Sequence, residues 1–315
     1  MVNLNNRKGI FVAKNSRLSS LVGVGSRFKL GGVFYYTFGA LITLIFAFPM
    51  IFMMVSSLKP DQQIFVDLHS FKAFLPSGDV SFHNYEGVFS RMPVLQFLLN
   101  SAVTSAIVVL LGLVVNSLAG FALSRVEWRG RGLVLGLLIA MLMVPFETIA
   151  IPMVFLVSKM PWVSFGSGFP EYHQGMMNTY EVQILPFIAS AFSIFLFAQY
   201  FKSIPKELDE AALIDGARWW TIYRKVIIPL AGPAFATSAI LNFLPIWNAY
   251  LWPIMTIQEE NMRPVQVGLQ YFFQMDTLWG EIMAYTTIIT LPVLVLFVAF
   301  QRAFVASIAS SGVKG

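Results

Sequence analysis

Few side chains in this chain could carry out acid–base, nucleophilic or metal chemistry, and most of them lie outside its apolar runs. The sequence has no cysteine and three histidines, His69, His83 and His173, all in segments expected outside a membrane. Without cysteine there is no thiolate nucleophile, disulfide or thiolate zinc site, and no two histidines have metal-ligand spacing. No Gly-x-x-x-x-Gly-Lys-Ser/Thr stretch cradles nucleotide phosphates. We therefore predict a non-catalytic chain with no catalytic residue, no metal site and no cofactor of its own.

Glu147 is the one carboxylate inside an apolar run, where no Lys, Arg or His accompanies it. An ionisable residue inside a membrane span is by default a functional candidate. Two interpretations stay open: Glu147 lines a polar cavity, or it lies in a kink near the outer interface. Pro145 and Pro152 flank it, and proline breaks the helical hydrogen-bond ladder. The kink is favoured, since a proton-coupled carrier needs several such groups.

The densest group of charges is a short polar segment between two apolar runs, residues 203–231. Pro205 suits the first turn of a helix, and acidic residues complement the positive end of its dipole. Gly216 is a typical helix C-cap. The pattern predicts a short helix of about three turns that is offered to a partner on one face; an interfacial helix without a partner is the alternative. The acidic residues are Glu207, Asp209, Glu210 and Asp215.

The elements that must position these residues follow from composition. Of 315 residues 57% are hydrophobic and 12% charged, against about 25% charged in soluble domains. Such a chain leaves too much apolar surface for a soluble globule, which excludes disorder, a nucleic-acid-binding domain and most soluble enzymes. A bilayer core needs about 20 apolar residues per helix. The charge-free runs predict six transmembrane helices, near residues 33–58, 97–124, 132–158, 182–202, 232–253 and 283–304.

The first run is predicted to be a retained anchor, because its apolar stretch exceeds the length of a signal peptide's apolar core. Most of the 21 Lys and Arg residues fall in the tails and in two alternate loops. By the positive-inside rule both termini are then cytoplasmic, and the net charge of +5 needs no nucleic acid to explain it. The predicted parts are a basic N-terminal tail 1–32, a membrane domain 33–304 and a C-terminal tail 305–315. The outer segments are 59–96, an irregular 159–181 and 254–282, with net negative charge.

A specific resemblance rests on the segment 203–231. Glu210-Ala211-Ala212, three residues, Gly216, nine residues and Val226-Ile227-Ile228-Pro229 resemble the EAA loop, E-A-A-x3-G-x9-I-x-L-P, of ATP-binding-cassette (ABC) importer permeases. Three further segments, 203–208, 214–217 and 247–253, and the ending 311–315 are similar to carbohydrate importers of the maltose type, the MalG-like permeases. Val226 and Ile228 depart conservatively from the pattern. The longer N-terminal tail and extra residues around 160–175 also depart from it.

The resemblance implies an all-α, type I ABC importer permease in a bacterial or archaeal cytoplasmic membrane. Its partners would be a second homologous permease, two ATPase subunits that bind the ATP and Mg, and an extracytoplasmic binding protein that delivers a sugar. ATP closure of the ATPases would move the EAA helices and open the pathway outward. The residues implied to couple to the ATPase are Glu207, Asp209, Glu210, Ala211, Ala212, Asp215 and Gly216.

Sugars are held by aromatic faces and amide or hydroxyl groups. Span five offers Asn242, Trp247, Asn248 and Tyr250 as substrate-path candidates, although hydrogen bonding between helices and an interfacial aromatic belt are the favoured interpretation. Two other functions stay open. One is an ABC permease for another solute, such as glycerol phosphate or a polyamine; the other is a stand-alone secondary carrier, which should show inverted repeats and paired mid-membrane charges.

Overall fold

The computed structural model describes residues 27–164, 170–273 and 277–312. These residues fall into two compact units that meet between Phe52 and Met53. The first unit is the part of helix α1 (Arg27–Ser56) up to Phe52. Its described side chains are largely exposed, with Phe34, Tyr36 and Phe46 each more than 70% accessible. A helix that is apolar all round suits a membrane span. Most of the predicted tail 1–32 lies outside the described residues.

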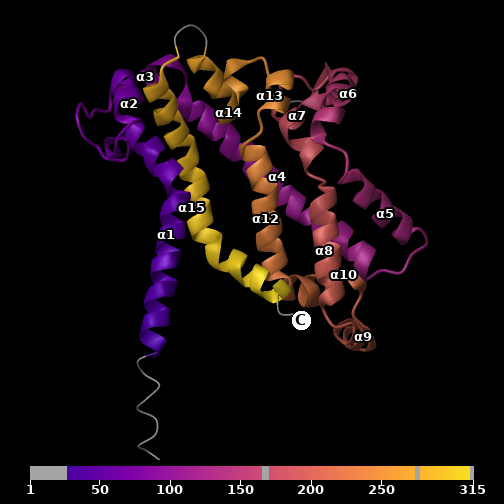
Figure 1. Cartoon of the computed structure of the whole chain (residues 1–315). Helices are drawn as coiled ribbons and strands as arrows, with labels where there is room; N and C mark the ends of the chain where they lie inside the picture. Colours follow the sequence, from indigo (N-terminus) through magenta and orange to yellow (C-terminus); the bar gives the residue numbers. More distant parts are fainter. Residues whose placement is uncertain (1–26, 165–169, 274–276, 313–315) are drawn as a thin grey trace, which may run out of the picture. The chain divides into compact units, whose positions relative to one another are not determined.

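Four helices organise the second unit. The central helix α4 (Val94–Ser124) packs against α8 (Ala191–Ser203) and α12 (Gly232–Trp247), and α12 also packs against α15 (Trp279–Gly312) (Figure 1). Helices can approach closely where their contact face carries small residues. The small residues buried on α4 are Ser101, Thr104, Ser105, Gly112, Ser117, Gly120 and Ser124.

Gly120 lies where α4 and α8 come close. A Cβ added there would be 2.6 Å from Phe197 Cβ and 3.0 Å from the Ala198 nitrogen. We expect Gly120→Ala to push the helices apart and to lower the free energy of unfolding by about 1–3 kcal/mol, the usual cost of overpacking. Gly136→Ala in α5 (Arg131–Met141) is the matched control, because a Cβ at Gly136 meets nothing within 4 Å. Thermal unfolding in detergent measures both; equal Tm values would contradict the prediction.

The number of spans agrees with the sequence, but not their continuity. Within the described residues four helices are long and apolar enough to cross a membrane, and two bent pairs raise the number to six. The predicted single helix 132–158 is wrong: α5 and α6 (Phe146–Lys159) are bent by 105°. Pro145 explains the break, since it lacks an N–H and disfavours helical geometry in the residue before it. Glu147 is exposed in the first turn of α6, directly after this break.

The predicted span 232–253 is also interrupted. α12 ends at Trp247, and a separate helix, α13, runs from Leu251 to Thr256. Pro253 cannot donate a backbone hydrogen bond to Ala249, and its ring would clash with that carbonyl in a continuous helix. Before α12 the chain forms a helical stretch bent by 82° from it. This stretch comprises α10 (Trp219–Ile222), the π-helical η3 (Tyr223–Ile227) and α11 (Ile228–Leu230).

The segment between α1 and α4 is an ordered cap rather than a loose loop. The Lys59 ammonium is buried and donates to Asp67 Oδ2 at 2.8 Å and to the Lys72 carbonyl at 2.7 Å. This hydrogen bond from Lys59 lowers the pKa of Asp67. Asp61 accepts from the backbone N–H of Gly280 at 2.7 Å, which ties the cap to the start of α15. The cap contains α2 (Asp61–Asp67), η1 (Phe71–Phe74) and α3 (His83–Arg91).

The segment 159–181, expected to be irregular, is partly ordered. Two short strands, β1 (Pro161–Ser164) and β2 (Glu171–Gln174), pair antiparallel with Trp162 opposite His173. Pairing satisfies backbone groups that an irregular chain would leave to water. The chain is therefore helical except for this hairpin, within the residues described. The remaining elements are α7 (Tyr180–Ile184), η2 (Leu185–Phe187), α9 (Glu207–Ile214), η4 (Glu260–Met262), α14 (Val265–Gly268) and η5 (Leu269–Phe272).

Candidate functional site

Helix α9 is the short helix that the acidic segment predicts, although at eight residues it is nearer two turns than three. Pro205 lies before its N-cap, Lys206, rather than in its first turn. Gly216 adopts a left-handed φ of 81° just beyond the last turn. The N–H of Ala217 then reaches the Ala212 carbonyl at 2.9 Å and that of Gly216 the Leu213 carbonyl at 3.0 Å. These two bonds are a Schellman C-cap, so the predicted role of Gly216 as a helix stop is confirmed.

Most of the predicted coupling residues lie on the outer face of α9. Glu207, Glu210 and Ala211 are exposed, as are Asp215 and Gly216 at the helix end. Exposed apolar side chains accompany them: Leu208, Leu213 and, at 87% accessibility, Ile214. A rigid, capped helix with a mixed acidic and apolar face has the features of a docking element. Ile214 was not predicted as part of this face; its exposure follows from its place at the end of the helix.

Ala212 and Asp209 face the other way. Ala212 packs against an aromatic core formed where α4, α8 and η3 meet. In that core the Tyr223 hydroxyl lies 2.7 Å from Ser117 Oγ, and the ring of Phe121 packs against those of Trp219 and Tyr223. This contact fixes the π-helical turn on α4. The exposed Trp219 and Trp220 sit beside it.

Asp209 makes a buried ion pair that the sequence analysis missed. Its carboxylate Oδ2 lies 3.2 Å from Arg125 Nε, and the two side chains are 7% and 1% exposed. Arg125 follows the last residue of α4 and donates from Nη2 to the Ile204 carbonyl at 2.7 Å. Burial raises the pKa of Asp209, and the nearby charge of Arg125 opposes that rise. The end of α4, the turn after α8 and helix α9 therefore meet at one guanidinium.

The four substrate-path candidates separate into two pairs. Asn242 is buried, accepts from Ser193 Oγ at 2.9 Å, and so joins α12 to α8. Trp247 is also buried, and its indole N–H donates to the Ile289 carbonyl of α15 at 3.2 Å. Both side chains hold helices together, as the favoured interpretation expects.

Asn248 and Tyr250 lie exposed in the break between α12 and α13. Asn248 Oδ1 accepts from Gln266 at 3.0 Å, and the Tyr250 hydroxyl accepts from Gln270 at 2.8 Å. The two glutamines were not predicted; their spacing of four residues after Pro264 was the available signal, because it places both on one helical face. The side chains of Asn248, Tyr250, Gln266 and Gln270 thus form a polar row beside the break between α12 and α13.

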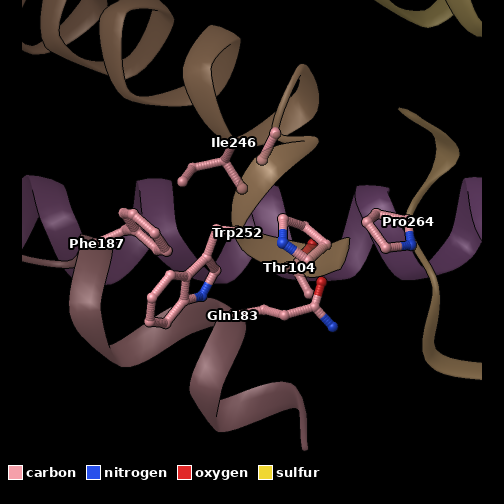
Figure 2. Close-up of a pocket in the computed structure, with 8 residues that line it drawn as sticks. Thr104, Gln183, Phe187, Ile246, Trp252 and Pro264 are labelled. Carbon is pink, nitrogen blue, oxygen red and sulfur yellow. The ribbon is translucent and has the colours of Figure 1, made fainter. Parts of the chain in front are cut away.

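A small cavity lies behind this row, between α4, the α7–η2 segment and the α12–α13 break (Figure 2). Its volume is about 10 Å³, close to what one water molecule needs. Trp252 forms one wall, and its indole N–H donates to the Val182 carbonyl at 2.9 Å. The cavity is too small for a sugar ring. The lining residues are Thr104, Gln183, Phe187, Ile246, Ala249, Trp252, Pro253 and Pro264.

Comparison with known proteins shows to which family the chain belongs. The family model described as "Binding-protein-dependent transport system inner membrane component" matches residues 109–310. The chain is 30% identical to the arabinooligosaccharides transport system permease protein AraQ of Halalkalibacterium halodurans, over 88% of this chain and 94% of that protein. It is 29% identical to the lactose transport system permease protein LacG of Rhizobium radiobacter, over 90% and 97%.

A third relative is the trehalose/maltose transport system permease protein MalG of Thermococcus litoralis, at 30% identity over 87% of this chain and 94% of that protein. Among solved structures, a bacterial ABC transporter involved in the import of the acidic polysaccharide alginate matches with a TM-score of 0.69 and 21% identity. That match covers 89% of this chain and 98% of the solved chain. At this level of identity the structural match establishes the fold.

Proposed function

Because this chain belongs to the family of binding-protein-dependent transport system inner membrane components, we propose that it is the permease subunit of an ABC importer that takes up a sugar or oligosaccharide. It is a multi-pass protein of the cytoplasmic membrane. The relatives named for arabinooligosaccharides, lactose and trehalose/maltose support a carbohydrate substrate. The observation that carries the proposal is α9, a capped helix whose EAA residues Glu210 and Ala211 are exposed.

In this proposal α9 lies in the cytoplasm and docks into a cleft of an ATPase subunit. A second permease completes the pathway, and a solute-binding protein delivers the sugar at the opposite end, where the cap and the hairpin lie. The ATP and Mg belong to the ATPases. Closure of the ATPase dimer would move α9 and switch the permease between inward- and outward-open states by rigid-body motion. The N- and C-termini then lie in the cytoplasm.

The first test is a gentle-detergent purification of the chain from its native membrane, followed by mass spectrometry. Recovery of a second six-span permease and an ATPase supports the proposal. The accompanying binding protein is then screened against arabinooligosaccharides, lactose, maltose, trehalose and, for contrast, glycerol phosphate. If the binding protein binds only glycerol phosphate, the substrate is not a sugar and the chain is an ABC permease for another solute. If the chain is recovered alone and transports unaided, it is a secondary carrier and not an importer subunit.

Tyr250→Ala is expected to impair uptake without harming folding. The side chain is exposed and bonds to Gln270 across the polar row, so its loss removes a contact available to a sugar. One hydrogen bond contributes about 0.5–1.5 kcal/mol, so we expect KM for uptake to rise up to about tenfold. Asn242→Ala is the comparison, because it strips Ser193 of a buried partner and should lower the yield of folded protein instead. Uptake kinetics and size-exclusion profiles separate the two; a Tyr250→Ala protein with unchanged KM would remove Tyr250 from the path.

A further inference from the structure

The Arg125–Asp209 pair lies at one end of the long helix α4. α4 has 31 residues and, at 1.5 Å per residue, is about 46 Å long. No proline interrupts it, whereas α12 and α15 each contain one, at Pro245 and Pro292. Prolines are the usual sites of helix kinks. α4 is therefore the stiffest connection between the two ends of the second unit.

At its far end α4 holds the segment before α14. Asn100 Nδ2 donates to the carbonyls of Asn261 and Arg263 at 2.7 and 3.0 Å. Ser101 Oγ accepts from the backbone N–H of Val265 at 2.9 Å. Asn100 and Ser101 are 2% and 1% exposed, so these bonds are shielded from water. A displacement of α4 along or about its axis must carry residues 261–265 with it.

The near end is held by a buried ion pair as well as by the aromatic core against which Ala212 packs. Arg125 Nε and Nη1 and Asp209 Oδ1 are all buried without a hydrogen-bond partner among the described residues, so the 3.2 Å contact between the two side chains is an ion pair without a hydrogen bond. Removing two charges from water costs several kcal/mol, and well-packed apolar residues of similar size often stabilise a fold as well or better. A pair with unsatisfied atoms is thus a poor device for stability alone. Together, the ion pair with Asp209 and the hydrogen bond from Nη2 to the Ile204 carbonyl tie α9 and the turn after α8 to the end of α4.

On the premise of the proposed function, we propose that the Arg125–Asp209 pair is the positioning link through which movement of α9 displaces α4. Helix α4 then passes that displacement to residues 261–265 at its far end. Arg125 acts through Asp209 and through the Ile204 carbonyl, which ties the same guanidinium to the turn after α8. The partner ATPase would move α9 from outside, and the pair would prevent α9 from sliding over the end of α4.

The test uses the assembled complex and takes advantage of a chain without cysteine. Spin labels on Gln62→Cys in α2 and Gln258→Cys before η4 report the far end. Both positions are exposed; α2 is tied to the start of α15 through Asp61, whereas the segment of Gln258 is held by α4. The distance between the labels is measured before and after adding ATP, Mg²⁺ and vanadate. In the otherwise unchanged chain we expect the distance to shift.

The decisive variant combines Arg125→Met with Asp209→Leu, which removes both charges and leaves none unpaired. We expect it to assemble with the ATPases in the normal ratio, to lose most of the distance shift, and to lower uptake about tenfold, within the usual range of coupling between sites. A structural role alone would restore both shift and uptake in this double variant, and that result would overturn the proposal.

Arg125→Lys covers the case in which the double variant does not assemble. Lysine keeps a charge for Asp209 but lacks the planar fork that also reaches Ile204. A reduced shift in an assembled Arg125→Lys complex supports the link, and an unchanged shift overturns it. If the unchanged complex contains ATPases but shows no shift, the inference fails while the proposed function stands. If no ATPase is recovered at all, the proposed function itself fails.

Discussion

Glu210→Lys is expected to detach the ATPase and to reduce uptake about a hundredfold. Glu210 is exposed in the first turn of α9, beside the apolar side chains that would enter the ATPase cleft. Reversing its charge opposes the positive end of the helix dipole. Within an interface it also places a charge against a surface built for the opposite sign, which costs several kcal/mol. Co-purification of the ATPase and uptake in membrane vesicles measure the two effects.

Glu210→Gln is the matched control, because it keeps the shape and removes only the charge. We expect it to retain the ATPase and most of the uptake. The buried pair is not the cause of the lysine effect: the charge of Glu210 raises the pKa of Asp209, so a lysine there would favour the ionised Asp209 carboxylate. A Glu210→Lys complex that keeps its ATPase and transports normally would exclude Glu210 from docking.

Gly216→Val is expected to lower uptake about tenfold or more by unravelling the end of α9. The φ of 81° at Gly216 costs a residue with a side chain about 1–2 kcal/mol, and a β-branched residue is a severe outlier there. Without that φ the N–H of Ala217 cannot reach the Ala212 carbonyl, and the last turn with Ile214 loses its fixed position. Uptake and ATPase co-purification are again measured.

Gly216→Asn separates backbone strain from side-chain volume. A Cβ at Gly216 meets nothing within 4 Å, so bulk alone is tolerated. Asparagine adopts left-handed geometry more readily than most residues, and we expect it to keep most of the uptake. Gly216→Asp has the same shape but adds a negative charge at the negative end of the helix dipole, so it should fall between Asn and Val. Equal activity of the Val and Asn variants would show that the C-cap is not needed for coupling.

Much of the architecture was predictable because its determinants are local in sequence. The length of each charge-free run predicted six spans, since only a run of about 20 apolar residues crosses a bilayer. The acidic residues in the first turn of α9 and Gly216 after its last turn predicted this short helix, because the preferences at helix ends depend on residues within one turn. The prediction that two spans are continuous helices was wrong near Pro145 and Pro253. At these positions proline interrupts the helix although the surrounding run is apolar.

The family, the number of membrane spans and the position of the EAA helix could be predicted from the sequence, because they depend on composition and short-range spacing. Which polar residues are buried could be seen only in the folded chain. Folding put Asn242 between helices and left Asn248 exposed six residues later, and it brought Arg125 to Asp209 across 84 positions of the chain. Burial and long-range contacts depend on how helices pack against one another. Packing brings together residues whose spacing in the sequence does not indicate that they are in contact.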